Sequence, residues 1–510
     1  MELTQIFQDA AQIVVELGIK YIWIDSICII QDDADDWSRE SKKMAYYQFS
    51  WLTIVATFIN ESGGIIQTMN EEDMQRVVRL PYRDKSGHQK GYFYAQFSEI
   101  GVRQEDYENS ICCSDILTRG WVYQEWLLSP RILTFSKSAL FVQCQSTNPM
   151  AISGDLEEID LPKVANIGFV KPTASIKLSA DSLHGAKSST HAKWQSLVES
   201  YSKLGITQFT GDRLVALAGI ASEYERAFHN IHQRFSGTET PDAAANYTHY
   251  ICGLWYPDID GLLWEQSNPT SLTRVSGIPT WSWASIANLQ RNDARVYIKT
   301  GMTVRWVNRS THDIPEKGSK HLCASVSAMR IHVTQMNDDE WLPDFSKATD
   351  IIPDTFANEN RFVLLHMRGF LQHVYIDAVF DSKWDAATMA YQTGHDGTQQ
   401  DLWRRLSLPS LPNTVAGWAS IEHPDYQTDA ACRSNGPFYA FLTEQFPGPK
   451  GSFGLGHFFT SVPAYKMLVV RMVTVPGFSD VYERVGVGRL FGREINAVFG
   501  GLAERDVRLI

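Results

Sequence analysis

Cysteine is scarce in this sequence, and its spacing forms no recognisable framework. The chain of 510 residues has seven cysteines, an odd number, and the only close neighbours are Cys112 and Cys113. Adjacent cysteines are too close for ordinary disulfide geometry, and no C-x-x-C pair is present. The sequence therefore predicts reduced thiols, with no support for a zinc ribbon or a dithiol redox site.

Long apolar runs and leader patterns are absent as well. No stretch reaches the roughly 18 apolar residues of a membrane-spanning helix. Residues 1–20 contain acidic side chains and apolar residues at helical spacing, whereas a signal peptide begins with a basic segment followed by an apolar one. We therefore expect a cytoplasmic protein.

The chain has no excess of positive charge. Its 46 Lys and Arg residues against 58 Asp and Glu give a formal net charge of −12. This balance argues against nucleic acid or an anionic membrane as the main partner, because both need a basic surface. The hydrophobic content of 44% and the charged content of 20% are those of a globular protein, and the length predicts two or three domains.

Signatures of common enzyme classes are also missing. The sequence has no nucleophile elbow and no H-E-x-x-H helix, and its 14 histidines show no metal-ligand spacing. Gly451, Gly454 and Gly456 do not follow a clear strand or open a clear helix, which favours a loop over a phosphate site. We expect neither a metal nor a bound cofactor.

The first 150 residues carry the pattern of an α/β domain. The expected elements are a helix over 3–17 ended by Gly18, a strand over 19–24, a helix from Asp32 to about Phe49 with Trp37, Met44 and Tyr47 facing inward, and a strand over 52–56. This order predicts a right-handed parallel βαβ unit in an open, mainly parallel sheet. A hairpin is expected near Asp84–Gly87, followed by strands at 132–135 and 139–144.

The remaining chain is divided by composition. Residues 146–190 are polar and predict a linker or surface loop, residues 192–265 are helical in pattern, and Ile278–Ser285 closes that region. Alternating runs at 295–299, 303–307, 329–333 and 466–473 predict an antiparallel module with a helical insert at 384–406. We assign an α/β domain to 1–150, a linker and helical extension to 151–290, and a β-rich domain to 291–510.

Two carboxylates are the main functional candidates. Asp25 follows the apolar run 19–24 and is therefore expected at the end of a strand. An acid at this position lines the ligand crevice of an open α/β sheet. Trp121 and Glu125 are four residues apart on a predicted helix and share one face, so the indole can wall a pocket that holds the carboxylate. The alternatives are a helix-capping Asp25 and a Glu125 that pairs with Arg119 or Arg131.

Each of the neighbouring candidate residues has two interpretations. Gln124 either binds a ligand amide or caps a backbone group, and Arg119 and Arg131 either bind phosphate or pair with acids on the surface. Trp281-Ser-Trp283 is either an aromatic platform or, as apolar neighbours favour, part of the core.

Several of these segments together resemble the fungal heterokaryon-incompatibility (HET) domain. The resemblance is carried by residues 17–32 around Asp25, by Asp36-Trp37 and Met44, by Leu117-Thr-Arg119-Gly-Trp121-Val-Tyr-Gln124-Glu125, and by Leu128-Ser-Pro-Arg131. Downstream, Asp212-Arg213 to Gly219 and Pro279-Thr-Trp281-Ser-Trp283-Ala-Ser285 look like segments that commonly follow this domain, and Tyr482–Gly488 is a looser likeness.

The HET domain is similar to the TIR signalling fold, whose nucleotide hydrolases use a helical Trp-x-x-x-Glu. Trp121 and Glu125 match that spacing, while Arg119 and Val122 depart from the usual Ser and Cys. The family's opening strand block is not found upstream of the first helix, so we expect an N-terminally truncated copy whose sheet lacks its first strand.

The resemblance implies an effector of fungal non-self recognition, programmed cell death and innate immunity, with cleavage of NAD as its candidate activity. In that reading Glu125 is catalytic, with NAD as substrate bound by Asp25, Trp121, Gln124 and Arg119 or Arg131. The alternatives are a non-enzymatic interaction module that self-associates through the α/β domain, and an inactive truncated remnant.

Overall fold

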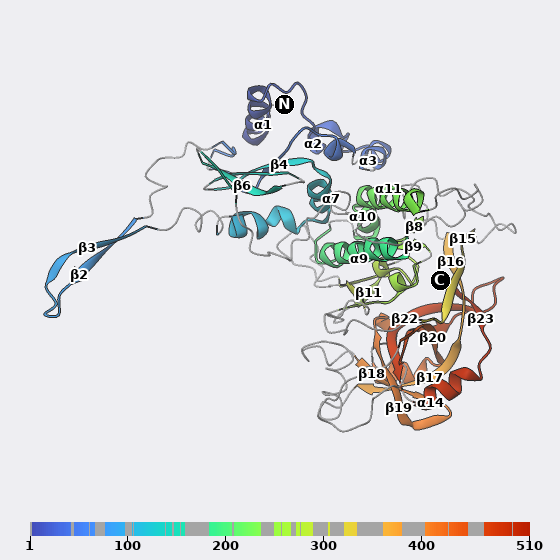
Figure 1. Cartoon of the computed structure of the whole chain (residues 1–510). Helices are drawn as coiled ribbons and strands as arrows, with labels where there is room; N and C mark the ends of the chain where they lie inside the picture. The colour runs from blue at the N-terminus through green and yellow to red at the C-terminus, as the bar shows by residue number, and fades with distance from the viewer. Residues whose placement is uncertain are drawn as a thin grey trace. The chain divides into compact units, whose positions relative to one another are not determined.

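The chain divides into two compact units, Met1–Lys177 and Leu178–Ile510, in the computed structural model. The structure describes residues 3–41, 45–60, 62–66, 77–96, 105, 107–137, 139–144, 147–153, 155–158, 183–206, 209–235, 249–256, 258–266, 272–275, 277–288, 304–306, 321–333, 361–379, 403–426, 428–446, 464–491 and 493–510. The expected strand at 295–299 and the glycines at 451–456 lie outside these residues, and so does most of the expected insert at 384–406. Figure 1 shows the elements of both units.

A five-stranded sheet organises the first unit. Its strands are β1 (Thr53–Ala56), β4 (Arg131–Phe135), β5 (Leu140–Cys144), β6 (Thr147–Ser153) and β7 (Asp155–Glu158), in that spatial order. Only β1 and β4 are parallel, and the other three pairings are antiparallel. The expectation of a mainly parallel sheet is therefore corrected. Connections as short as residues 136–139 permit only an antiparallel return.

The helices of the first unit are short. They are α1 (Gln5–Glu16), α2 (Asp25–Cys28), α3 (Ala34–Ser41), α4 (Ala45–Gln48), the π-helix η1 (Tyr107–Cys112), the 3₁₀-helix η2 (Asp115–Thr118) and α7 (Gly120–Leu128). The predicted first helix is confirmed, and Gly18 follows it with a φ of 69°, as a helix-ending glycine does. Trp126 of α7 packs with Val55, Ile132 and Phe141 of the sheet.

The predicted strand at 19–24 is wrong, and the βαβ unit built on it is wrong with it. These residues have no helical or strand assignment and lead directly into α2. Trp23 instead stacks on Tyr46, with ring centroids 4.9 Å apart, and contacts Tyr47 edge-on at 5.6 Å. Aromatic packing against α4 thus replaces the backbone pairing that the apolar run suggested.

The hairpin predicted near Asp84–Gly87 is confirmed. It consists of β2 (Val77–Arg83) and β3 (Gln89–Gln96), which pair antiparallel as a sheet of two strands. Gly87 has a φ of 85° and donates its N–H to the Asp84 carbonyl over 2.9 Å.

Three helices begin the second unit, α9 (Leu183–Tyr201), α10 (Phe209–Val215) and α11 (Ala218–Phe235). The helical prediction for 192–265 holds as far as α11 and is wrong beyond it. Short elements follow instead: β8 (His249–Ile251), β9 (Leu254–Tyr256), the 3₁₀-helix η4 (Asp260–Leu262), β10 (Trp264–Gln266), β11 (Leu272–Arg274), the 3₁₀-helix η5 (Trp283–Ser285), β12 (Ile286–Asn288) and β13 (Val304–Trp306). Cys252 and Gly253 both have positive φ, which turns β8 back onto β9.

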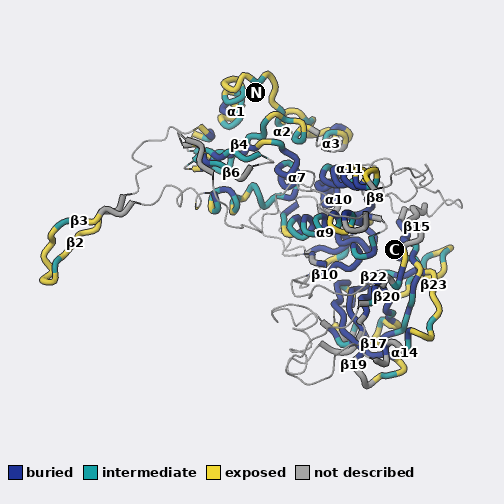
Figure 2. Tube along the Cα trace, in the orientation of Figure 1, coloured by how far each residue is buried: buried dark blue, intermediate teal, exposed yellow. Residues whose placement is uncertain are grey.

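A closed barrel of strands forms the core of the β-rich region. The ring runs β17 (Leu371–Val379), β18 (Trp403–Leu408), β19 (Leu411–Ile421), β22 (Val481–Phe491), β21 (Ala464–Met472), β20 (Phe438–Phe446) and back to β17, with every pairing antiparallel. The interior includes Leu406, Met467 and Val485, and α14 (Arg493–Gly500) adds Phe499. Figure 2 shows these strands largely buried.

Additional elements extend this barrel. β14 (His321–Leu322) pairs with β20, β23 (Arg505–Leu509) lies parallel to β22, and β16 (Arg361–Gly369) and β15 (Ala324–Val333) continue from β23. The 3₁₀-helix η9 (Pro424–Tyr426) and α13 (Asp429–Ser434) lie between β19 and β20 in the chain. The antiparallel module predicted from alternating runs is thus confirmed in the described strands, apart from the parallel pairing of β22 with β23.

The closeness of β19 and β22 leads to a stability prediction. A methyl group at Gly417 would collide with the carbonyl oxygen of Arg489 in the paired strand. We expect Gly417→Ala to lower the free energy of unfolding by about 1–3 kcal/mol. Gly500→Ala is the control, because its methyl group meets no atom within 4 Å and the residue ends α14. Urea unfolding of both variants tests this, and equal midpoints would contradict it.

Candidate functional site around Glu125

Two side chains of the helix α7 are accessible to solvent. Of its nine residues, only Trp121 and Glu125 are half-buried, and the other seven are buried. The helix follows Arg119, whose backbone is extended, and ends where Ser129 donates its hydroxyl to the Glu125 carbonyl over 2.6 Å. The spacing of four residues places both half-buried side chains on the same face, as the sequence predicted.

Glu125 lies among three polar side chains from separate segments. The hydroxyl of Tyr47, from α4, donates a hydrogen bond to its carboxylate. Asp25, the first residue of α2, and Arg119 are close enough to act on it electrostatically. A carboxylate, a phenol, a second carboxylate and a guanidinium therefore share one site at the accessible face of α7.

The protonation of Glu125 reflects these surroundings. Burial, together with the negative charge of Asp25, raises the pKa of Glu125 to about 7. Arg119 and the Tyr47 hydroxyl oppose this shift by stabilising the charged form. The pKa of Tyr47 is raised by burial and by both carboxylates, so its hydroxyl stays protonated and acts as a donor. Glu125 therefore exchanges a proton near neutral pH.

Asp25 is exposed and reaches the site from a helix start. Its carboxylate accepts the N–H of Ser26 over 2.7 Å, and its carbonyl accepts the N–H of Ile29 over 3.0 Å. The sequence placed Asp25 at the end of a strand; it instead opens α2 after an irregular segment. Its closeness to Glu125 survives this change because Trp23 packs the segment against Tyr46 and Tyr47.

The other two candidates, Gln124 and Arg131, have different surroundings. Gln124 is fully buried on the inner side of α7. Arg131 is exposed, donates to the Trp51 carbonyl over 3.1 Å and lies 5.7 Å from the Trp51 ring centre. Of the two arginines considered, Arg119 is thus the one whose charge acts on Glu125. The sequence predicted that Tyr47 faces inward. No pattern in the sequence indicated its hydrogen bond to Glu125.

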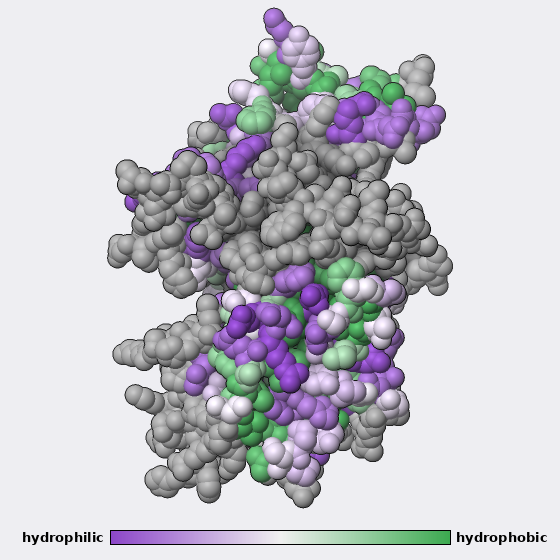
Figure 3. Space-filling model, turned by 90° about the vertical axis from the view of Figure 1, so that its right-hand side faces the viewer, coloured by the Kyte–Doolittle hydropathy of each residue, from purple (hydrophilic) through white to green (hydrophobic). Residues whose placement is uncertain are grey.

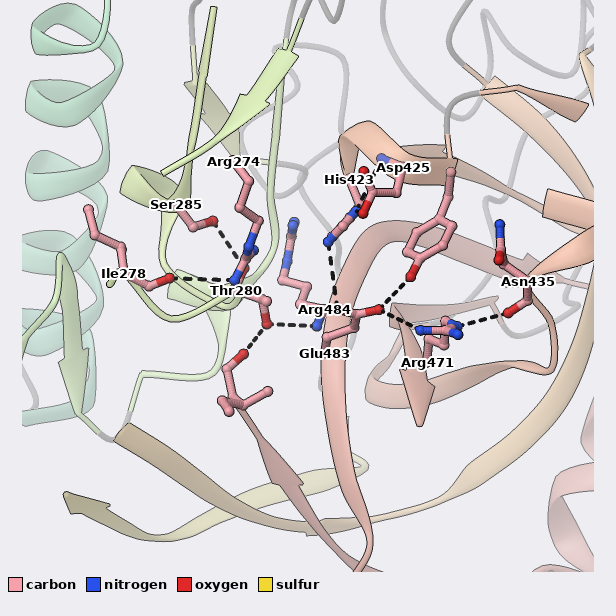
Figure 4. Close-up of polar contacts among 12 residues, drawn as sticks. Arg274, Ile278, Thr280, Ser285, His423, Asp425, Asn435, Arg471, Glu483 and Arg484 are labelled. Atoms are coloured by element: carbon pink, nitrogen blue, oxygen red, sulfur yellow. Dashed lines mark hydrogen bonds and ion pairs between the residues drawn. The ribbon is translucent and has the colours of Figure 1, made fainter. Parts of the chain in front are cut away.

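A second polar group lies in the C-terminal unit (Figure 4). The Glu483 carboxylate accepts from the Tyr426 hydroxyl at 2.7 Å and from Arg471 Nη1 at 3.2 Å, and His423 Nε2 lies 3.6 Å away. The Asp425 N–H donates to His423 Nδ1 over 3.3 Å, which leaves the ring proton on Nε2, facing Glu483. These side chains satisfy one another and join η9 to β21 and β22.

The segments that resemble sequences downstream of the family domain converge in this unit. Arg213 donates to the carbonyls of Ala284 and Ile286, and its guanidinium lies 5.0 Å from the Trp283 ring centre. The Arg484 N–H donates to Thr280 Oγ1 over 2.8 Å (Figure 4). Trp281 and Trp283 are fully buried, which confirms the core interpretation of that segment.

Two further features are absent from the described parts of the chain. No three His, Cys, Asp or Glu side chains there are grouped to hold a metal ion. Likewise, no helix among those residues has the length and apolar character to span a membrane.

Comparison with known proteins identifies the N-terminal segment. Residues 1–125 match the family described as Heterokaryon incompatibility protein (HET). No curated protein and no solved structure matches the chain. The matched range contains Asp25, Tyr47, Arg119 and Trp121 and ends at Glu125. The chain therefore carries a heterokaryon-incompatibility (HET) domain over residues 1–125.

Proposed function

We propose that this chain acts in heterokaryon incompatibility by cleaving the bond between nicotinamide and ribose in NAD, as TIR-like hydrolases do. The observation that carries the proposal is the accessible face of α7. Trp121 and Glu125 alone are half-buried there, and Tyr47, Asp25 and Arg119 gather on the Glu125 carboxylate. The HET match by itself supports the coarser statement, a function related to heterokaryon incompatibility.

The proposed chemistry needs a carboxylate beside the ribose. The bond from C1′ to the nicotinamide nitrogen breaks, its electron pair stays on that nitrogen, and neutral nicotinamide leaves. Water then adds to the cationic C1′ and releases one proton, which yields ADP-ribose. An ionised Glu125 stabilises the oxocarbenium-like transition state, in the way that carboxylates act in glycoside hydrolysis.

Neighbouring side chains take supporting roles in this proposal. Trp121 offers an aromatic wall one helical turn before Glu125, against which the nicotinamide ring stacks. Arg119 binds the diphosphate, and Asp25 accepts from a ribose hydroxyl. Arg131 is assigned no role, because it contacts Trp51. Gln124 is fully buried, so the proposal gives it no contact with the substrate.

The pH dependence of turnover tests the role of Glu125. Because burial raises the pKa of Glu125 to about 7, the active carboxylate forms only as the pH rises through that value. We expect kcat/KM for NAD to increase with pH and to level off above about 7. Chromatography of released nicotinamide measures it.

Tyr47→Phe sharpens this test. The variant lacks the phenolic hydroxyl and therefore loses a hydrogen bond that stabilises the charged form of Glu125. The midpoint of the pH profile should therefore move to higher pH. A flat profile, or a midpoint that does not move in the variant, would count against Glu125 as the titrating group.

A second candidate function is a non-enzymatic module that signals by self-association. One observation favours it: large apolar side chains are exposed in the first 66 residues, among them Tyr21, Ile27, Phe49 and Trp51. Exposed apolar surface on this scale commonly marks an interaction site. Absence of NAD turnover from a chain that self-associates would favour this candidate.

A further inference from the structure

The β2–β3 hairpin has an apolar face that the described residues leave open. Cross-strand pairing sets Leu80 beside Phe93 and Tyr82 beside Gly91, so Leu80, Tyr82 and Phe93 share one face. The rings of Tyr82 and Phe93 meet edge-on at 5.2 Å. Phe93 is 60% exposed, and every described side chain from Leu80 to Phe93 is exposed or half-buried (Figure 2).

A hairpin of this kind gains little stability by itself. Isolated two-stranded ribbons are marginal in water, and an exposed aromatic face adds a cost that a partner removes. Pro81 in β2 cannot donate to a ladder, which places its nitrogen on the outer edge and disfavours strand addition there. The apolar face is therefore the better docking surface.

The hairpin is basic on an acidic chain. Residues 77–96 contain four basic residues and one acidic residue, whereas the whole chain has a net charge of −12. Arg83, Lys85 and Lys90 are exposed around the turn, and Asp84 neutralises part of this charge through Lys90 at 3.4 Å. A complementary partner must then be both apolar and acidic.

The exposed side chains of one segment of the same unit, residues 21–35, have this character. We define them as the acidic apolar face: the exposed residues Tyr21, Ile22, Ile27 and Ile30 with the exposed carboxylates Asp32, Asp33 and Asp35. Tyr21 is 87% exposed. At the upper end of Figure 3, hydrophobic and strongly hydrophilic residues lie side by side.

We propose that the β2–β3 hairpin of one chain docks on the acidic apolar face of a second copy. Leu80, Tyr82 and Phe93 cover Tyr21, Ile22 and Ile27, while the basic turn meets Asp32 and Asp35. The two surfaces differ, so the contact is heterologous and each added copy leaves a free hairpin and a free face. This proposal rests on the second candidate function, self-association, and specifies the surfaces that carry it.

Charge reversal on the full chain tests the docking. Sedimentation velocity should show wild-type association that rises with protein concentration and falls with salt. Arg83→Glu with Lys85→Glu, or Asp32→Lys with Asp35→Lys, should weaken association at least about tenfold. An equimolar mixture of these two double variants should associate again, since each supplies the partner that the other lacks. Phe93→Ser should weaken association independently of salt, and Lys137→Glu, at an exposed turn elsewhere in the unit, should leave it unchanged.

The outcomes distinguish hairpin docking from self-association through another surface. Association that all hairpin and face variants leave intact would overturn hairpin docking and keep self-association. A wild-type chain that stays monomeric at every concentration would overturn both. Loss in each double variant with recovery in the mixture would establish the contact, because general misfolding of either variant gives no recovery.

Discussion

Glu125→Gln is expected to reduce nicotinamide release from NAD by about 10²–10³-fold or more. The amide keeps the size of the side chain and can still accept from the Tyr47 hydroxyl, but it carries no negative charge for a cationic transition state. The loss should appear in kcat, because the interaction strengthens as the positive charge develops on the ribose. Turnover that persists in the variant would remove Glu125 from the proposed mechanism.

The same variant should fold at least as well as the wild-type protein above neutral pH. Since burial raises the pKa of Glu125 from 4.5 to about 7, the folded state binds the proton more tightly than the unfolded state. Wild-type stability therefore falls as pH rises from about 4.5 to about 7, and glutamine removes this dependence. Thermal unfolding at pH 5 and pH 8 checks the sign. Glu16→Gln, at an exposed position of α1, is the matched control for both activity and stability.

At pH values above about 8, where Glu422 is ionised, Arg484→Met is expected to lower the free energy of unfolding of the C-terminal unit by about 3–5 kcal/mol. Arg484 and Glu422 are each 1% exposed and lie 3.2 Å apart. The guanidinium also donates to the carbonyls of Leu262 and Trp264 and lies 3.6 Å from the Trp264 ring centre. Methionine leaves these acceptors and the Glu422 carboxylate buried without their donor.

Two comparisons isolate the buried charge as the cause. Arg368→Met removes an ion pair with Glu504 of similar length, 2.9 Å, but both partners are exposed, so the cost should stay below about 1 kcal/mol.

Burial raises the pKa of Glu422 to about 8, and losing Arg484 raises it further. The deficit of Arg484→Met should therefore grow as pH increases, and Glu422→Gln in the same chain should recover part of it. Similar urea midpoints for Arg368→Met and Arg484→Met would contradict this account.

Local patterns in the sequence anticipated several elements correctly. The apolar spacing of residues 3–17 predicted α1, the turn residues at Asp84–Gly87 predicted the hairpin, and the spacing of Trp121 and Glu125 predicted their common face. The run 19–24 misled because an apolar segment satisfies either strand pairing or aromatic packing. Its Trp23 found aromatic partners in α4.

What the sequence by itself determined is local: helix periods, turns, the faces of α7, and the family to which residues 1–125 belong. Only the tertiary structure decided which side chains meet. It brought Tyr47 and Asp25 to Glu125, directed Arg131 to Trp51, and joined Arg484 to Thr280 across more than two hundred positions. The physical reason is that periodicity acts over a few residues, whereas desolvation and pairing of charges depend on which distant segments share a buried site.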